Sequence, residues 1–505
     1  MVAFTRRHLA LALALTFASN AAPAANSAEG ELLQELKRLS ARLEKVEQRN
    51  AELEKKLETT VTTGTMERRV KTLEESQARV VRGLEDENIS ENEPDLTSRL
   101  KAVEYQALGM QKQARTVEAL EGITAGMSLT TTAQKAIGVA PGAAPNGASQ
   151  LNYRGDVYVT LPLPAIGNTE NRIFTQFRLG QGQGLNDLPV YAKPNASAFR
   201  ALNTAPDNSV AILGQAWYQA TVPLPFGGFK PRSREQLEIN FGKMDPFVFF
   251  DQNAVANDET RQFLNTVFVH NALLDAGSDI GVDANGFSPG FRVSYFNETQ
   301  KPENWRASLG VFGAGQGANY VRFFSSPLVI AQLETQRRLF GGLTGNYRLY
   351  AWHNGQGPSY DGTFESHSGW GVNVDQRLGD YTTLFGRYGQ QLKGRVRFDR
   401  ALSLGAEFGG AYWERGGDAI GLALGLQRTG AAFNRDSATV DADGDGIADY
   451  GYTASGAERI LEAYYRYRIH KQFELSPDFQ YIANPGGHGA SSPVKILGLR
   501  AQLTF

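Results

Sequence analysis

The 505-residue sequence contains no cysteine, which excludes disulfide bonds, thiolate metal sites and a lipid-carrying cysteine after a signal peptide. Beyond its N-terminal segment, the sequence also lacks any run of the roughly twenty apolar residues that a membrane-spanning helix needs. Neither sign of charge dominates, because 51 lysines and arginines face 53 aspartates and glutamates and leave a formal net charge of −2. This near balance argues against a nucleic-acid partner.

Signatures of common enzyme sites are missing as well. The sequence has no phosphate-binding GxxxxGK[ST], no HExxH and no GxSxG motif, and its 6 histidines are scattered without the spacing of metal ligands. Glycine-rich stretches are present but lack the strand-to-helix context of a nucleotide site. We therefore expect a protein that is not an enzyme and requires no cofactor.

The N-terminus has the pattern of a secretory signal peptide. Arg6 and Arg7 precede an apolar run over residues 9–17, and small residues follow at positions 22–24. This order of a basic, an apolar and a small-residue region is typical of a cleaved signal, and the apolar run is too short to span a bilayer. Residues 1–24 are predicted to be removed on export.

A heptad pattern follows the signal. From Leu32 to Leu57 the seam positions alternate in steps of four and three, with Asn50 as the one polar seam residue, while Glu, Lys and Arg fill the flanks. Such a seam predicts an intermolecular coiled coil, in which a buried Asn tends to fix register. A single amphipathic helix packed on another domain is the alternative, but it would need a wider apolar stripe. We assign residues 30–123 to a periplasmic coiled-coil region.

The segment after this region is predicted to be a linker. Residues 133–149 are rich in Ala, Gly and Pro, a composition typical of loops. The linker is therefore assigned to residues 124–149, and the C-terminal domain to residues 150–505.

The last strand of the chain indicates the class of that domain. Leu497, Leu499, Ala501, Leu503 and Phe505 share one face, while polar residues and a glycine alternate with them on the other. A closed barrel pairs such a last strand with the first and leaves no polar backbone facing lipid. The sequence predicts an all-β outer-membrane barrel whose apolar rows face lipid and whose polar rows face a wet lumen.

The lengths of the connections fit the same class. Short turns are predicted at residues 378–380 and 470–472, and long connections at 353–367 and 428–459. In membrane barrels the short turns belong to the periplasmic side and the long loops to the outside. The residues after 150 accommodate about 14 to 18 strands of nine to eleven residues, and we expect about 16.

Several segments resemble the OprB family of carbohydrate-selective outer-membrane porins. They are LEINFGKMDPFVFFDQNAVANDETRQFLN (237–265), GNYRLYAW (345–352), GWGVNVDQRLGDYTTLFGRYG (369–389), residues 418–424 and EAYYRYRIHKQFELSPDFQYIANPGG (462–487). The resemblance implies a sixteen-stranded barrel that admits small, glucose-like sugars by diffusion through a constriction lined with charged side chains. The helical N-terminal third departs from the simplest members. It is similar in plan to sugar porins with a periplasmic coiled coil, which implies a homotrimer.

Charged residues on the predicted lumen-facing rows are the candidates for contact with solute. They are Arg348, Arg387, Arg466, Arg468, Arg500, Glu238, Glu462 and Asp478. Arginine suits sugar recognition because its guanidinium offers five fixed donors and lies flat against a ring. The alternative is that each points inward only because an arginine at the lipid midplane costs about 2 to 4 kcal/mol. Trp217 and Trp352 are expected to form either a stacking surface or part of an interfacial aromatic girdle.

An acidic stretch, DADGDGIADYG, places Asp441, Asp443, Asp445 and Asp449 around turn-forming glycines. Hard oxygen ligands at alternate positions are what Ca²⁺ requires. The twelfth position counted from Asp441 is Tyr452, so the bidentate Glu of an EF-hand is missing. The loop is therefore either a weak Ca²⁺ site on the outer face or a solvated acidic loop.

Together these patterns predict a porin of the Gram-negative outer membrane that allows passive diffusion of small sugars, with its N-terminal region in the periplasm. A general or anion-preferring porin is an alternative, since arginine-rich lumen rows also attract phosphate and organic acids. A third hypothesis makes the coiled coil an envelope spacer or tether in contact with the cell wall, with the barrel as its anchor in outer-membrane lipid.

Overall fold

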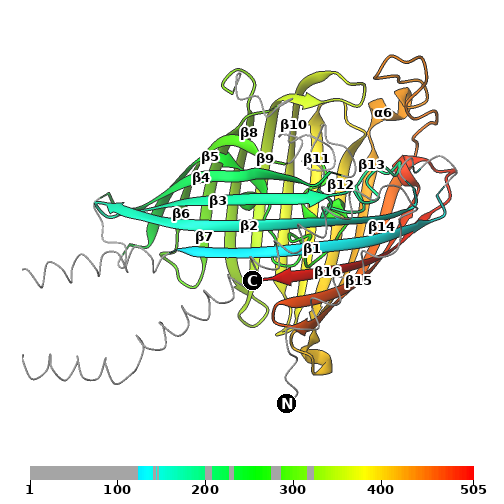
Figure 1. The fold of residues 1–505 in the computed structure, drawn as a ribbon. Helices are drawn as coiled ribbons and strands as arrows, with labels where there is room; N and C mark the ends of the chain where they lie inside the picture. The colour runs from blue at the N-terminus through cyan, green and yellow to red at the C-terminus, as the bar shows by residue number, and fades with distance from the viewer. Residues whose placement is uncertain are drawn as a thin grey trace, which may run out of the picture. The chain divides into compact units, whose positions relative to one another are not determined.

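The structure is a computed structural model that describes residues 123–139, 144, 147–199, 208–226, 233–274, 286–314 and 323–505. In this part of the chain, sixteen antiparallel strands form one closed barrel in which every strand pairs with its sequence neighbours and β1 pairs with β16 (Figure 1). The predicted barrel and its strand number are confirmed. The predicted signal peptide and, apart from residue 123, the predicted coiled coil lie outside the described residues.

The strands are β1 (Thr124–Ile137), β2 (Ser149–Ile166), β3 (Thr169–Gln181), β4 (Val210–Leu224), β5 (Glu235–Met244), β6 (Ser288–Asn297), β7 (Asn304–Phe312), β8 (Leu328–Leu339), β9 (Leu343–Pro358), β10 (Phe364–Arg377), β11 (Thr382–Lys393), β12 (Phe398–Gly409), β13 (Ala419–Thr429), β14 (Ala457–His470), β15 (Phe473–Ala483) and β16 (Val494–Thr504). Short helices lie in the connections: η1 (Pro246–Val248), α5 (Thr266–Val269), η3 (Gly410–Trp413), α6 (Ala431–Asp436) and η4 (Pro485–Gly487). In the described part of the chain, no helix combines the length and apolar character needed to cross a bilayer.

The predicted linker over residues 124–149 is wrong, because this segment contains the whole of β1 and the first residue of β2. Thr130, Thr132 and Gln134 face inward and are buried, while Met127 and Leu129 are exposed on the outer face. This is strand alternation in a threonine-rich sequence, and threonine favours strands. The Ala-, Gly- and Pro-rich composition belongs to the connection between β1 and β2, so the barrel begins near residue 124 rather than 150.

The connections alternate in length, as predicted for a membrane barrel. Residues 167–168, 340–342 and 471–472 form tight turns at the end of the barrel where the chain terminates, and long connections lie at the other end. The long connection predicted at 353–367 is wrong, because β9 continues to Pro358 and β10 begins at Phe364. Backbone pairing in this polar, glycine-containing stretch, for example Asn354 with His367, extends the hairpin beyond the apolar band.

Side chains alternate between the two faces of the barrel. On β16, Leu497 is 52% exposed on the outside, whereas the inward Arg500 is 1% exposed. Outward aromatic residues gather near both ends of the strands. They are Tyr295, Trp305, Tyr347, Tyr465 and Phe473 toward the tight turns, and Phe241, Phe291, Trp370 and Tyr481 toward the long connections. Two aromatic belts around an apolar band are typical of outer-membrane barrels.

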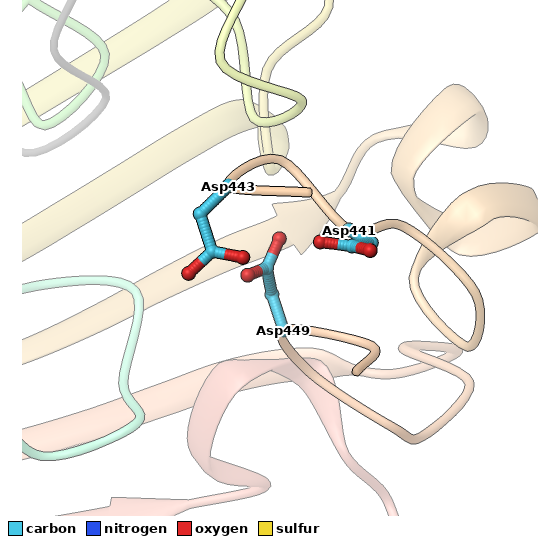
Figure 2. A group of neighbouring side chains, drawn as sticks. All are labelled: Asp441, Asp443 and Asp449. Atoms are coloured by element: carbon cyan, nitrogen blue, oxygen red, sulfur yellow. The ribbon is translucent and has the colours of Figure 1, made fainter. Parts of the chain in front are cut away.

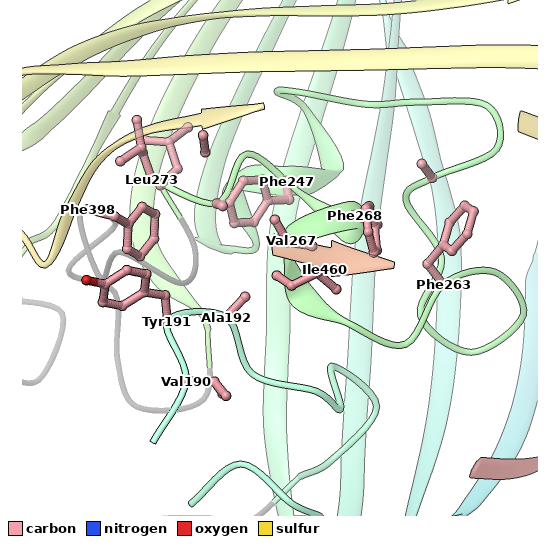
Figure 3. Packing of buried hydrophobic residues seen from close by; sticks show 14 of the residues in the cluster. Val190, Tyr191, Ala192, Phe247, Phe263, Val267, Phe268, Leu273, Phe398 and Ile460 are labelled. Carbon is pink, nitrogen blue, oxygen red and sulfur yellow. The ribbon is translucent and has the colours of Figure 1, made fainter. Parts of the chain in front are cut away.

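The buried apolar core lies inside the barrel. Parts of two long connections, which we name inward segment A (residues 185–199) and inward segment B (residues 245–274), pack there against inward-facing strand residues and residues of other connections. Figure 3 shows Tyr191 of segment A and Phe263, Phe268 and Leu273 of segment B packed near strand residues such as Ile460. Burial of this apolar surface draws both segments into the lumen.

Candidate functional site in the barrel lumen

Inward segment B contains two short capped turns, one at its start and one near its end. The Asp245 carboxylate accepts a hydrogen bond of 2.9 Å from the backbone N–H of Phe247 and caps η1. Asn265 caps α5 in the same way, by accepting from the backbone N–H of Val267 at 3.1 Å. Such caps satisfy backbone donors that would otherwise be buried without a partner. Burial raises the pKa of Asp245, and the nearby His270 partly opposes that rise.

Asp251 fixes the middle of segment B to the barrel wall. Its fully buried carboxylate lies 3.1 Å from Nε of Arg387 on β11. It also accepts hydrogen bonds from the Asn373 amide on β10 at 2.6 Å, the Tyr350 hydroxyl on β9 at 3.0 Å and the backbone N–H of Asn271 at 2.6 Å. One carboxylate therefore joins three adjacent strands to the segment.

Two charged side chains of the wall hold another part of segment B through its backbone. Glu462 on β14 accepts hydrogen bonds from the N–H groups of Leu264 and Asn265 at 2.5 and 2.9 Å. Arg500 on β16 donates through Nη1 to the carbonyl oxygens of Glu259 and Gln262, at 2.9 and 2.7 Å. These bonds satisfy backbone groups of an irregular segment far from any strand edge, as buried polar groups require.

Segment A is held in a similar manner. Glu458 on β14 accepts hydrogen bonds from the backbone N–H groups of Tyr191 at 2.8 Å, Ala192 at 3.3 Å and Gly486 at 2.7 Å. The Tyr191 hydroxyl in turn lies 2.7 Å from the Thr429 hydroxyl on β13. Strand β14 therefore anchors both inward segments, segment A through Glu458 and segment B through Glu462.

A second group of charges leaves part of its surface in the lumen. Glu238 on β5 pairs with Arg292 on β6 at 3.1 Å and with Arg306 on β7 at 2.5 Å. The Arg306 side chain remains 24% exposed. On the neighbouring strands, Arg348 pairs with Asp375 at 2.8 Å and lies 3.6 Å from Glu334.

A third group lies where segment B meets β12, β14 and β15. Glu474 accepts from Arg261 of segment B at 2.5 Å and from Arg468 at 2.9 Å, and both arginine side chains remain 36% exposed. Arg466 pairs with Glu407 at 3.2 Å. Each of these guanidinium groups contacts a carboxylate, so the charges of the two signs lie close together.

Segment B also carries an acid that pairs with β2, away from the strands β9 to β11 that hold Asp251. Glu259 lies 2.7 Å from Arg154 on β2, which also contacts Asp156 at 2.9 Å. Burial acts to raise the pKa of Glu259, but the positive charges of Arg154 and Arg178 outweigh this effect, so its pKa lies below the usual value. The carboxylate therefore stays ionised within the lumen and ties segment B to β2.

All eight charged residues predicted for the lumen point inward, but they do not form one site. Five are buried and make internal contacts: Arg348, Arg387, Arg500, Glu462 and Asp478. Three keep partial exposure: Arg466, Arg468 and Glu238. A role in selectivity stays a prediction for each of them. Trp217 and Trp352 are buried inside the barrel, so they belong to neither the outer girdle nor an exposed stacking surface.

Several important residues were not predicted. Alternation on the lumen-facing rows was sufficient to find Arg154, Arg292 and Arg306, because each lies on a strand whose other face is apolar. Asp251 and Arg261 lie in an irregular connection, where no periodic pattern tells which side chains turn toward the wall.

The acidic loop lies in the connection between β13 and β14. Asp441, Asp443 and Asp449 bring carboxylate oxygens within 4.8 Å of one another, while Asp445 is not a member of this group. Figure 2 shows these three side chains in the loop. The Asp441 carboxylate accepts from the N–H groups of Gly444 and Gly446, both at 2.8 Å. The bond from Gly446 is the main reason why the pKa of Asp441 is lowered.

Comparison with known families decides the identity of the barrel. The family described as "Carbohydrate-selective porin, OprB family" matches residues 175–505, which is more than half of the chain. The chain belongs to the OprB family. As an OprB-family protein it is a sugar-preferring porin of the outer membrane, and its activity is passive passage rather than catalysis.

A solved porin structure shares its fold. The high-pH structure of Pseudomonas putida OprB superposes with a TM-score of 0.59 at 17% sequence identity, over 77% of this chain and 96% of that one. A mutant of the Rh. blastica porin matches with a TM-score of 0.38 at 7% identity, over 76% of this chain and all of that one. A search of curated proteins gave no significant match to this OprB-family chain.

The Asp251 anchor makes a direct prediction. Asp251→Asn keeps the shape of the side chain but leaves the buried Arg387 guanidinium without its counter-charge, a change that costs about 3–5 kcal/mol. Segment B should then detach from the wall for part of the time, and single-channel recordings should show larger or fluctuating conductance.

The exposed turn residue Asp380 provides the matched control, since Asp380→Asn removes the same charge from a turn. The double variant Asp251→Asn with Arg387→Gln removes both charges and should recover part of the loss. Steady, wild-type conductance in Asp251→Asn would contradict the anchoring role.

Proposed function

We propose that sugars pass along the partly exposed charges of the lumen, with Arg261, Arg306 and Arg468 as donors to sugar hydroxyls. Each guanidinium has five donors, and its carboxylate partner accepts only part of them. The remaining donors are available to a solute that brings several hydroxyl groups. Glu238, whose side chain keeps 15% exposure, serves as a matching acceptor, because its carboxylate has about four acceptor sites and accepts one hydrogen bond each from Arg292 and Arg306.

The pairing of these charges carries the proposal. Arg261, Arg306, Arg466 and Arg468 each contact a carboxylate, so positive and negative ends alternate over short distances. Such an arrangement favours a neutral, polyhydroxylated solute over a small anion, because opposite charges nearby weaken the field that would attract an anion. This supports sugar over phosphate or organic acids as the preferred cargo.

Liposome swelling with sugars and anions of matched size tests this route. The variant Arg261→Gln with Arg468→Gln should slow sugar entry about fivefold, the equivalent of losing roughly one net hydrogen bond. Arg338→Gln with Arg377→Gln removes the same charge from exposed positions by the tight turns and serves as the control. Wild-type protein that prefers anions, with current blocked by phosphate rather than sugars, would favour the anion-porin alternative.

We infer further that residues 30–123 form a periplasmic coiled coil that joins three copies of the chain. The heptad seam in the sequence supports this, and β1 begins beside the C-terminal residue, at the tight-turn end of the barrel. The detergent-solubilised full chain should have the mass of a trimer, and a chain without residues 30–123 that of a monomer. Equal subunit numbers would contradict this inference. If cells that carry the chain without residues 30–123 had a weakened envelope but unchanged sugar uptake, the region would instead be assigned to cell-wall tethering.

We also propose that Asp441, Asp443 and Asp449 bind Ca²⁺. Their clustered carboxylate oxygens support this, while the missing bidentate Glu points to a dissociation constant of about 10⁻⁴ to 10⁻³ M. Calorimetric titration with CaCl₂ should show binding heat for the wild type and for Asp445→Asn. The heat should disappear in Asp443→Asn with Asp449→Asn. The same heat in that double variant, or none in the wild type, would overturn the proposal.

A further inference from the structure

Three arginines lie side by side on the outer face of the barrel, near the end that carries the long connections. Arg400 on β12 lies directly opposite Arg428 on β13. Arg459 on β14 is paired with Leu426, two residues from Arg428, so it occupies the diagonal position. All three side chains are exposed.

Two lysines extend this row around the barrel. Lys495 on β16 pairs with Tyr481 on one side and with Ile137 on the other, and Lys135 on β1 pairs with Leu497. Both lysines are exposed on the outer face. We name the five residues Arg400, Arg428, Arg459, Lys495 and Lys135 the outward basic rim.

The outward basic rim differs from the charges of the lumen in lacking acidic partners. Among the described residues, none of its members forms an ion pair, and the strand positions that face outward at this end from β11 to β1 carry no acid. The acid that acts on it is Asp399, at the bulge beside Arg400, and one carboxylate does not balance both Arg400 and Arg428. Like charges directly opposite one another destabilise a sheet, so an anionic ligand would relieve a cost that the protein alone leaves uncompensated.

The surface just below the rim is apolar. Toward the barrel centre, the next outward residue is an exposed leucine for four of the five rim residues and the exposed Ala133 for Lys135. The leucines are Leu402 at 37%, Leu426 at 38%, Leu461 at 40% and Leu497 at 52%. Tyr481 lies opposite Leu461 on one side and Lys495 on the other, where an amphipathic ring suits the boundary of the acyl region.

We propose that the outward basic rim binds the phosphate groups of a phosphorylated, multiply acylated glycolipid in the outer leaflet, with its acyl chains on the leucines below. Arg400 and Arg428 lie on neighbouring strands, and neighbouring strands in a sheet are about 4.8 Å apart. Their guanidinium groups are therefore suited to bridge one phosphate by bidentate hydrogen bonds. The proposal rests on the end with long connections facing outward, as in the proposed porin function.

Binding of lipid A to the full-length protein in detergent, followed by native mass spectrometry, tests the proposal. Wild-type protein should retain phosphorylated lipid A and bind the same lipid without phosphates much more weakly. The triple rim variant combines Arg400→Gln, Arg428→Gln and Arg459→Gln. It should bind phosphorylated lipid A roughly 100-fold more weakly than the wild type, because each basic residue near a lipid surface contributes a several-fold factor to the affinity. Arg428→Gln alone should give an intermediate loss, which keeps the test valid if the triple variant folds poorly.

The matched control is Arg338→Gln with Arg377→Gln and Lys471→Gln, which removes three exposed charges near the tight turns and should bind as the wild type does. Equal binding of both lipids by the wild type, or undiminished binding by the triple rim variant, would overturn the proposal. Inorganic phosphate that displaces lipid A at equal concentration would also overturn it, since the site would then be one for free phosphate. Sugar entry into liposomes should be unchanged in the rim variant, so failure of the proposed sugar route is detected separately.

Discussion

The buried network around Asp251 is the interaction on which the channel architecture depends. A barrel of sixteen strands is wide enough to enclose a continuous water-filled lumen, so its bore is set by what folds into it. Here the Asp251 carboxylate joins β9, β10 and β11 to the irregular inward segment B, and Glu462 and Arg500 hold that segment from β14 and β16. Apolar packing draws the segment inward, and these directional bonds fix its position.

Charged residues accordingly have two tasks inside the same barrel. Those on β11 to β16 that lie under the inward segments are buried and bond to backbone groups, as Glu458 and Glu462 do. Charged residues that the inward segments do not cover, such as Arg306 and Arg468, keep part of their surface exposed in the lumen. Each of them is paired with a carboxylate. Outside, the lipid-facing rows carry no charge in the middle of the strands; Arg337 lies near the tight turns, and the outward basic rim lies near the long connections.

Sequence patterns predicted the parts of this architecture that repeat. Strict alternation located the C-terminal strands, and Arg500 and Glu462 were placed correctly on inward faces. Strand β1 was missed because its threonines and small residues give weak apolar contrast, although closure of the barrel requires a partner for β16. The division of the lumen charges between anchoring and exposure was not predictable. It depends on where segment B crosses the lumen, which is a tertiary property that no periodic pattern encodes.

The most direct test of the account is hydrogen exchange at the backbone amides of Leu264, Asn265 and Asn271 in the membrane-reconstituted protein. These amides donate to Glu462 and Asp251. The account predicts exchange as slow as that of amides in the central strands, because opening them requires segment B to leave the wall. Exchange as fast as at the exposed turn amides of Gly416 and Gly489 would show that segment B is not anchored and would contradict the account.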